Sequence, residues 1–430
     1  MKIAWFTPLH ERSAIGRFSE GVTTALAKLG VEIELWRSDT GPIHPVQLPV
    51  RTFIPDAETA SKLDRHYDLC IYNFGNYLPY HASIFEMSQR QAGLAILHDL
   101  TLHHFFASLY LERMHSPEAY SEALIRLYPE LKERFHSPQA LEAAQLWSGE
   151  EVTRYPFFDP VLENALGVVC HSRFHASAVE RRWPGPIQVM PLAYEPKQEL
   201  RKMAMLNAQP LSPNPRLLIV GHINPNKCVH LLFEALRNLQ PVEVICAGPI
   251  EGPYRARLEA IYSKLGIEGK LTLTGYISDH DLATYYSAAD LCINLRKPIT
   301  EGASASIIEQ MFLGKASLVF SEGFYGELPE ETVFRCKPAN LQMKLVEALK
   351  SREVRDRVGR AAKLHAEATF TYSAYAEKMR RRMSDVTESG PLFELAEHLG
   401  EELNSCGISR KDPMIARLSA IVGELFQRDH

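Results

Sequence analysis

Short apolar runs alternate with longer helical patterns along most of the chain. In the first half, the strand-like runs are 2–7, 31–37, 68–74, 93–99, 165–172 and 186–192. Most of them are apolar at nearly every position, which is typical of parallel strands that are buried on both faces. The first half therefore predicts one parallel sheet covered by helices.

The same alternation restarts after a polar, proline-bearing link at 195–215. Strand-like runs follow at 216–222, 241–248, 270–276, 290–296 and 315–321, again with helical segments between them. Ligands bind at the carboxyl ends of parallel strands, so two such domains predict a site in the cleft between them. We place the first domain at 1–200 and the second at 201–369.

Three segments depart from this alternation. Residues 100–163 have a helical pattern, and this insertion either covers the core of the first domain or forms a wall of the substrate site; both roles are compatible. Residues 370–383 predict a helix that crosses back to the first domain. The tail, 384–430, contains amphipathic runs that we expect to dock on the body or on a second copy of the chain, because isolated helices of this length are marginal in water.

Length and composition set broad limits on function. A chain of 430 residues exceeds what one hydrophobic core usually supports, and a net charge of −5 makes nucleic acid an unfavourable partner. The seven cysteines are dispersed, which favours a reducing compartment. With no basic-then-apolar leader and no apolar run of ~20 residues, we expect a cytoplasmic protein, and peripheral contact with a membrane stays open.

The segment 295–320 carries the most distinctive chemistry. Glu301 and Glu309 are separated by seven residues, and all five residues at 302–306 are small. Small side chains let a ligand approach the backbone, and the amides of a helix N-terminus attract anions. By itself, this pattern fits either a binding site or a well-capped helix.

Five segments, in this order along the chain, resemble the retaining glycosyltransferases of family four, which have a GT-B fold. The resemblance covers roughly 1–383 and weakens in the insertion. Its motifs are TPLHERSAIGRFSEG with Gly16, LHD with His98 and Asp99, VVCHSRFHASAVE followed by VMPLAY, VGHINPNKCVHLLFEAL with Lys227, and the segment of Glu301 and Glu309. His222 occupies a position where the family has an arginine, which is a departure from the pattern.

The resemblance implies an α/β fold with two facing Rossmann-like domains, the helical insertion and the helical tail. It also implies a nucleoside-diphosphate sugar as co-substrate, no cofactor, no metal, and a front-face substitution without a protein nucleophile. Glu309 is implied to bind the donor ribose, Glu301 to lie near the transferred sugar, and Lys227 to bind the phosphates. The implied catalytic residues are His98, Glu301 and Lys227, and the implied donor-binding residues are Gly16, His222, Lys227, Gly302, Ala303, Ser304 and Glu309.

Asn73, Asn76 and Asp99 follow strands of the first domain and are candidates for acceptor binding; for the two asparagines a simple turn is an equal alternative. The acceptor itself stays open: a glycan, a lipid-linked sugar, a protein or a small molecule. Rival interpretations are a nucleotide-sugar epimerase or phosphorylase on the same fold, or a non-catalytic partner subunit.

Two other signals have simpler explanations. The sequence Asp279-His280-Asp281 imitates a metal-binding Asp-x-Asp motif, but its position predicts a helix cap. The histidines at 98, 103, 104, 171 and 175 lack the spacing of a zinc site. We therefore expect no metal, and the missing glycine spacing excludes a nicotinamide-binding loop.

Overall fold

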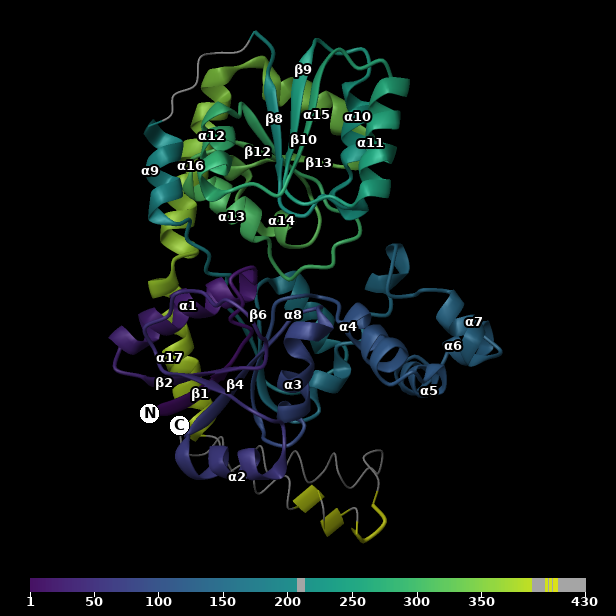
Figure 1. Ribbon diagram of the computed structural model, residues 1–430, viewed down its shortest axis with the longest axis vertical. Helices are drawn as coiled ribbons and strands as arrows, with labels where there is room; N and C mark the ends of the chain where they lie inside the picture. Colours follow the sequence, from purple (N-terminus) through teal and green to yellow (C-terminus); the bar gives the residue numbers. More distant parts are fainter. Residues whose placement is uncertain (207–212, 389–398, 401, 404, 409–430) are drawn as a thin grey trace. The chain divides into compact units, whose positions relative to one another are not determined.

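The computed structural model describes residues 1–206, 213–388, 399–400, 402–403 and 405–408. The chain forms two compact units, Met1–Arg381 and Arg382–His430, and both sheets lie in the first unit. Figure 1 shows the sheet of the second domain above that of the first.

The first sheet has seven parallel strands in the order β3-β2-β1-β4-β5-β6-β7. Its inner strands are largely apolar, and every residue of β4 and β5 is buried, including the polar Asn73 of β4. The prediction missed β3, a three-residue edge strand whose residues are all exposed and therefore leave no apolar signature. The strands are β1 (Lys2–Phe6), β2 (Glu32–Arg37), β3 (Val50–Thr52), β4 (Leu69–Phe74), β5 (Gly93–Leu97), β6 (Ala165–Cys170) and β7 (Ile187–Val189).

The second sheet has six parallel strands in the order β10-β9-β8-β11-β12-β13. The prediction missed only β13, which has three residues and a polar Arg335 at its centre. The strands are β8 (Arg216–Val220), β9 (Val242–Ala247), β10 (Gly269–Gly275), β11 (Leu291–Asn294), β12 (Ser317–Phe320) and β13 (Phe334–Cys336).

Helices connect successive strands in both domains, as is usual for a parallel sheet, except that a loop joins β2 to β3. In each sheet the strand order reverses once, between β1 and β4 and between β8 and β11. Such a switch point is where the loops at the carboxyl ends of parallel strands part to admit a ligand. The helices are α1 (Ala14–Lys28), α2 (Ala57–His66), α3 (Leu78–Ser88), α8 (Arg173–Glu180), α9 (Gln198–Leu206), α10 (Val229–Leu236), α11 (Gly252–Lys264), α12 (Asp279–Ala288), α13 (Ala305–Phe312), α14 (Phe324–Glu327), α15 (Leu341–Lys350), α16 (Arg352–Thr369) and α17 (Tyr372–Glu388).

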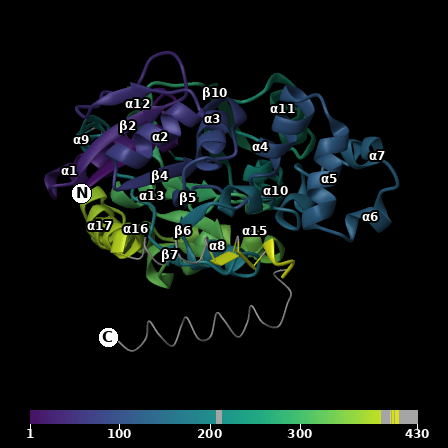
Figure 2. The ribbon, with the colours of Figure 1, turned by 90° about the horizontal axis from the view of Figure 1, so that it is seen from below.

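The insertion is a series of short helical segments. They are α4 (His103–Ala107), a π-helix (Ser108–Arg113), α5 (Pro117–Leu127), α6 (Leu131–Arg134), α7 (Pro138–Ala143), and 3₁₀ turns at Glu150–Thr153 and Asp159–Leu162. Its large side chains, such as Tyr120, Tyr155 and Phe157, are buried in the core of the first domain. The insertion therefore covers that core, and Figure 2 shows α5, α6 and α7 on the side away from α17.

The chain returns to the first domain at α17. The ring of Tyr375 lies 5.1 Å from that of Phe18 and 6.1 Å from that of His171, centroid to centroid. The predicted tail helices fall almost entirely outside the described residues, so association of copies through the tail stays a prediction. Among the residues that the structure describes, no helix is long and apolar enough to cross a membrane.

Candidate active site

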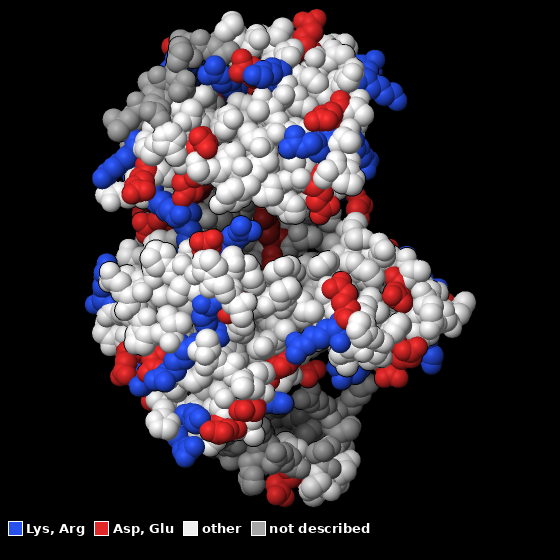
Figure 3. All heavy atoms as spheres, viewed as in Figure 1, with Lys and Arg blue, Asp and Glu red and all other residues white. Residues whose placement is uncertain are grey.

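A cleft of about 420 Å³ lies between the two domains and receives residues from both. Figure 3 shows the surface hollowed between the two halves, with acidic side chains inside the hollow. The first domain contributes the N-terminal turn of α1 and the ends of β4 and β5, and the second contributes the loop before α13. The lining residues are Arg12, Ser13, Ala14, Ile15, Phe18, Gly75, Asn76, Tyr77, Tyr80, His81, His98, Asp99, Leu192, Tyr194, Glu301, Ala303 and Ala305.

A backbone clasp between 98–101 and 300–302 joins the two domains at this cleft. The Leu100 amide donates to the Thr300 carbonyl (2.9 Å), and the Gly302 amide donates to the His98 carbonyl (3.0 Å). These bonds make Asp99 and Glu301 partners in an antiparallel bridge. The clasp thereby brings together residues that the sequence separates by about two hundred positions.

Gly302 makes the clasp sterically possible. A Cβ added there would lie 2.5 Å from His175 Nδ1 and 3.0 Å from the His98 carbonyl oxygen. Ser172 Oγ donates to the Gly302 carbonyl (2.7 Å) and fixes the loop from the other side. A side chain at this position would push the Glu301 loop away from the first domain.

Glu301 is held by two groups of the second domain. Tyr325 Oη donates to Glu301 Oε1 over 2.6 Å, and Arg296 Nε lies 3.3 Å from the same oxygen. Burial raises the pKa of Tyr325, and the neighbouring Glu301 charge adds to that shift. Tyr325 therefore stays a hydrogen-bond donor and leaves the second carboxylate oxygen of Glu301 for a ligand.

Asp99 faces Glu301 across the cleft. The Asn76 amide donates to Asp99 Oδ2 over 2.8 Å. Burial raises the pKa of Asp99 to about 7; the Asn76 hydrogen bond opposes this shift and the Glu301 charge adds to it. Near neutral pH, Asp99 can therefore accept or donate a hydrogen bond, which suits contact with an acceptor hydroxyl.

His98 lines the cleft, but protein groups contact both of its ring nitrogens. Asn73 Nδ2 donates to the Phe6 carbonyl (2.9 Å), so Asn73 Oδ1 must face His98 Nε2 (3.0 Å) and accept a hydrogen bond from it. His98 Nδ1 lies 3.2 Å from His171 Nε2. Burial lowers the pKa of His98 well below its usual value, and His171 adds to that shift. His98 is thus neutral, has a fixed ring orientation and lines the cleft. Its catalytic role stays a prediction.

Two predicted site residues are engaged by protein groups, and their predicted ligand contacts stay predictions. Asn73 is fully buried, and its side chain orients His98 instead of reaching the cleft. Gly16 lies inside α1, where its amide donates to Ser13 Oγ (3.0 Å) and is not available to a donor. Glycine is needed there because a Cβ would lie 2.7 Å from the Pro8 carbonyl oxygen. The residues of this segment that line the cleft are Arg12, Ser13, Ala14, Ile15 and Phe18.

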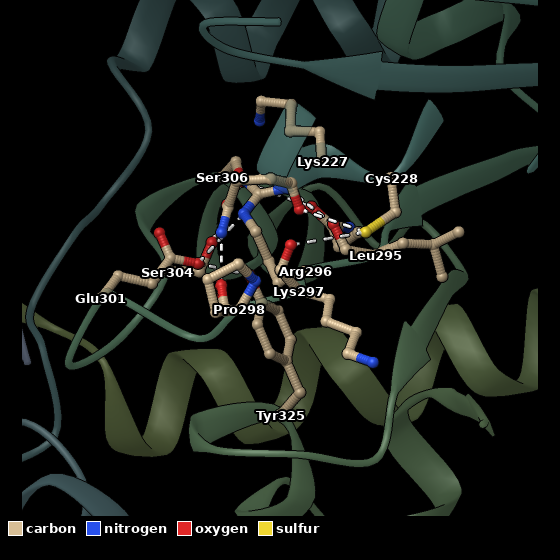
Figure 4. Close-up of polar contacts among 12 residues, drawn as sticks. Lys227, Cys228, Leu295, Arg296, Lys297, Pro298, Glu301, Ser304, Ser306 and Tyr325 are labelled. Atoms are coloured by element: carbon tan, nitrogen blue, oxygen red, sulfur yellow. Dashed lines mark hydrogen bonds and ion pairs between the residues drawn. The ribbon is translucent and has the colours of Figure 1, made fainter. Parts of the chain in front are cut away.

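The phosphate-binding candidates lie at the switch point of the second sheet. Lys227 is buried, and its Nζ donates to the Val220 carbonyl over 2.6 Å. Burial lowers the pKa of Lys227 well below its usual value, and the positive charge of Arg296 adds to that shift. Arg296 is also buried, and its Nη1 donates to the Leu295 carbonyl over 3.0 Å. Figure 4 draws Lys227, Arg296, Glu301 and Tyr325 as one group; His222, in contrast, is exposed.

Glu309 is buried on α13 and contacts both domains. Its Oε1 accepts from Tyr286 Oη (2.9 Å), and its Oε2 lies 3.7 Å from Arg17 Nη1 of the first domain. Burial raises the pKa of Glu309, whereas Arg17 and Tyr286 oppose that shift. Sequence reasoning did not identify Arg17, Tyr286 or Tyr325; only Arg17 had a local signal, since it follows Gly16 in the first loop.

The other predicted residues lie in the cleft or at the ends of nearby helices. Ala303 and Asn76 line the cleft, and buried Ser304 precedes α13 with its Oγ 3.1 Å from Ser306 Oγ. Ser278 Oγ accepts from the Asp281 amide (3.1 Å), which confirms the predicted helix cap. Within the described part of the chain, no three His, Cys, Asp or Glu side chains group as metal ligands do.

Comparison with known proteins agrees with this architecture. Residues 207–365 match the family model described as glycosyl transferases group 1. A search of curated proteins found no match to the chain. The matched segment coincides with the second Rossmann-like domain.

Several solved glycosyltransferases share the fold of nearly the whole chain. A sucrose-phosphate synthase from Thermosynechococcus elongatus superposes with a TM-score of 0.60 at 19% identity, over 90% of this chain and 100% of that chain. HepE from Anabaena, solved with UDP and glucose, superposes with a TM-score of 0.57 at 16% identity, over 89% of this chain and 99% of that chain. WaaG, a glycosyltransferase involved in lipopolysaccharide biosynthesis, superposes with a TM-score of 0.55 at 15% identity, over 87% of this chain and 98% of that chain. These likenesses confirm the GT-B fold.

Proposed function

We propose that this chain transfers a sugar from a nucleoside-diphosphate donor to an acceptor hydroxyl, with retention at the anomeric carbon and without a metal. The observation that carries the proposal is the buried positive pair Lys227 and Arg296 beside Glu301, in the domain that matches the glycosyltransferase model. Buried cations at the switch point of a parallel sheet suit a diphosphate, which proteins stabilise with charge and oriented donors.

Glu309 suits the donor ribose. A carboxylate can accept hydrogen bonds from two neighbouring hydroxyls. The Tyr286 contact to Glu309 is short at 2.9 Å, whereas the Arg17 contact is loose at 3.7 Å. A ribose would therefore replace Arg17 at Oε2 while Tyr286 continues to orient the carboxylate.

The reaction then needs positioning and charge stabilisation more than a nucleophile. The bond between the anomeric carbon and the phosphate oxygen breaks, and the acceptor oxygen attaches on the same face of that carbon. The acceptor proton passes to the departing phosphate oxygen. Lys227 and Arg296 stabilise the charge on that phosphate, Glu301 orients the sugar, and Asp99 holds the acceptor hydroxyl.

The first test is donor binding. Uridine, guanosine, adenosine and thymidine diphosphate sugars are added separately, and thermal stabilisation is read, because a ligand that binds only the folded state raises stability. UDP-sugars come first, since HepE, which shares this fold, was solved with UDP and glucose. We expect stabilisation by one base, and none by any member of the panel would overturn the proposal.

Glu309→Ala tests the assignment of the ribose contact. Loss of a charged hydrogen-bond acceptor predicts a dissociation constant for the nucleotide sugar that is about 10- to 100-fold larger. Glu330→Ala is the control, because the Glu330 side chain is 91% exposed. An unchanged dissociation constant for Glu309→Ala would remove the ribose contact from the proposal.

The products test the mechanism. Retention predicts that the anomeric configuration of the product, read by NMR, equals that of the donor, and activity should survive EDTA. An inverted product or loss of activity in EDTA would contradict this mechanism. Donor conversion without acceptor would identify an epimerase, and a requirement for phosphate would identify a phosphorylase. If a donor binds but none is turned over, the chain is a non-catalytic subunit.

A further inference from the structure

The second sheet carries a buried arginine, Arg296, where strand β11 ends. This arginine can supply the positive charge that is missing after β8, where the exposed His222 stands at the family's arginine position. We propose that Arg296 supplies the second positive charge on the donor diphosphate, together with Lys227, and that His222 does not contact the phosphates. This inference rests on the proposed function and adds a donor-binding residue to it.

The topology brings Arg296 to Lys227. Strands β8 and β11 are direct neighbours, with Leu291 opposite Leu217 and Cys292 opposite Leu218. Because both strands run in the same direction, the loops that follow them leave the sheet at the same edge. A cation after β11 therefore reaches the same volume as a cation after β8.

Contacts between the two loops fix this arrangement. The Lys297 amide donates to the Asn226 carbonyl over 3.0 Å, and the Asn226 side-chain amide donates to the Pro298 carbonyl. Cys228 Sγ lies 3.8 Å from the Lys297 carbonyl. These bonds flank Arg296 on one loop and Lys227 on the other, so the two cations are held beside each other before any ligand arrives.

Two basic side chains share one carboxylate in this group. Lys227 and Arg296 are each about 6% exposed. Among the described residues, the one carboxylate found within 4 Å of either side chain is that of Glu301, at 3.3 Å from Arg296. Burial and the charge of Arg296 disfavour the charged form of Lys227, and a bound anion would favour it, so this group has a place for a second negative charge.

As the second cation on a diphosphate, Arg296 is better suited than His222. The guanidinium is always charged and offers a planar fork that matches two phosphate oxygens, whereas lysine acts as a point charge. Arg296 uses Nε toward Glu301 and Nη1 toward the Leu295 carbonyl, and both contacts hold its plane in a fixed orientation. The exposed His222 has no comparable support among the described contacts.

The test compares ligands that differ only in their phosphates. For the base selected by the donor panel, the nucleoside, the monophosphate and the diphosphate are titrated into wild-type protein and into the variants Arg296→Ala, Arg296→Lys, His222→Ala and Lys297→Ala. Lys297 is the matched control, because it is the next residue, is about half exposed and pairs with Glu150 (3.1 Å). Circular dichroism melts verify that each variant is folded.

We expect Arg296→Ala to weaken diphosphate binding about 10- to 100-fold, because it removes a charged donor to phosphate, and to change nucleoside binding less than about threefold. Arg296→Lys should fall between wild type and Arg296→Ala, because it keeps the charge and loses the fork. His222→Ala and Lys297→Ala should bind the diphosphate as wild type does. If Arg296→Ala does not fold, Arg296→Lys decides the question.

Either of two results would overturn the inference alone: diphosphate binding unchanged in both Arg296 variants, or a large loss in His222→Ala. A wild-type protein that binds none of the nucleoside diphosphates would overturn the proposed function itself. The two failures are therefore distinguishable in one set of titrations.

Discussion

Replacing Asp99 by asparagine should stabilise the first domain in a manner that depends on pH. Asp99 lines the cleft, accepts from the Asn76 amide and faces Glu301 across the clasp. Asparagine has nearly the same shape, keeps an acceptor for Asn76 and carries no charge. Asp99→Asn thus mimics the protonated acid that burial favours.

The size of the effect follows from the pKa of Asp99. Folding raises it from 3.8 to about 7, so the folded state binds the proton more tightly than the unfolded state. The contribution of Asp99 protonation to the free energy of unfolding is therefore complete below about pH 4 and is lost as the pH rises through about 7. The full shift corresponds to about 4 kcal/mol, and because water in the open cleft screens the charge, we expect about 2 kcal/mol.

The assay can isolate the first domain. All four tryptophans, Trp5, Trp36, Trp147 and Trp183, lie in that domain, so fluorescence melts follow its unfolding. A gain of about 2 kcal/mol corresponds to a Tm about 4 to 8 °C higher for a domain of this size. We expect this rise at pH 8 and little change at pH 4.5.

Asp64→Asn is the control, because Asp64 is exposed in the same domain and should shift the Tm little at either pH. A Tm of Asp99→Asn that is lowered equally at both pH values would show that the carboxylate is needed structurally. A Tm equal to that of wild type at pH 8 would show that Asp99 is already ionised at no cost. Either result refutes the reasoning from burial.

Two further substitutions probe the clasp and the ribose contact. Gly302→Ala should raise the KM for the donor at least about tenfold, since the new methyl group would overlap His175 and displace the loop, and a KM equal to that of wild type in steady-state kinetics would contradict this. Tyr286→Phe should raise the pKa of Glu309 further and weaken donor binding about tenfold, with a larger loss at lower pH than at higher pH because the ionised carboxylate is the stronger acceptor; calorimetric titrations that find no pH dependence would disprove it.

The sequence predicts the sheets well because their strands are buried on both faces. β5 is a continuous apolar run and β4 is one except for Asn73, whereas β3 and β13 are three-residue edge strands without such a run. Local pattern therefore predicts the inner strands and the edge strands β7 and β10, whereas β3 and β13 depend on pairing that their short segments do not encode.

The candidate site divides in a similar way. The chain order of Lys227, Glu301 and Glu309 is readable from local motifs, and the fold gathers them in one domain as expected. The partners that orient them are not readable: Tyr325 lies 24 residues after Glu301, and Arg17 approaches Glu309 from the other domain. Such contacts exist only after both domains have folded, so no local spacing signals them.

The clasp also has a consequence for how this protein can diverge. Its hydrogen bonds use only main-chain atoms, from Leu100 and Thr101 to Thr300 and from Gly302 to His98. Apart from Gly302, which must stay small, mutation can change the side chains of these residues without removing a hydrogen bond of the clasp. The side chains at 100, 101 and 300 can therefore drift, while the backbone that brings Asp99 and Glu301 together is inherited unchanged.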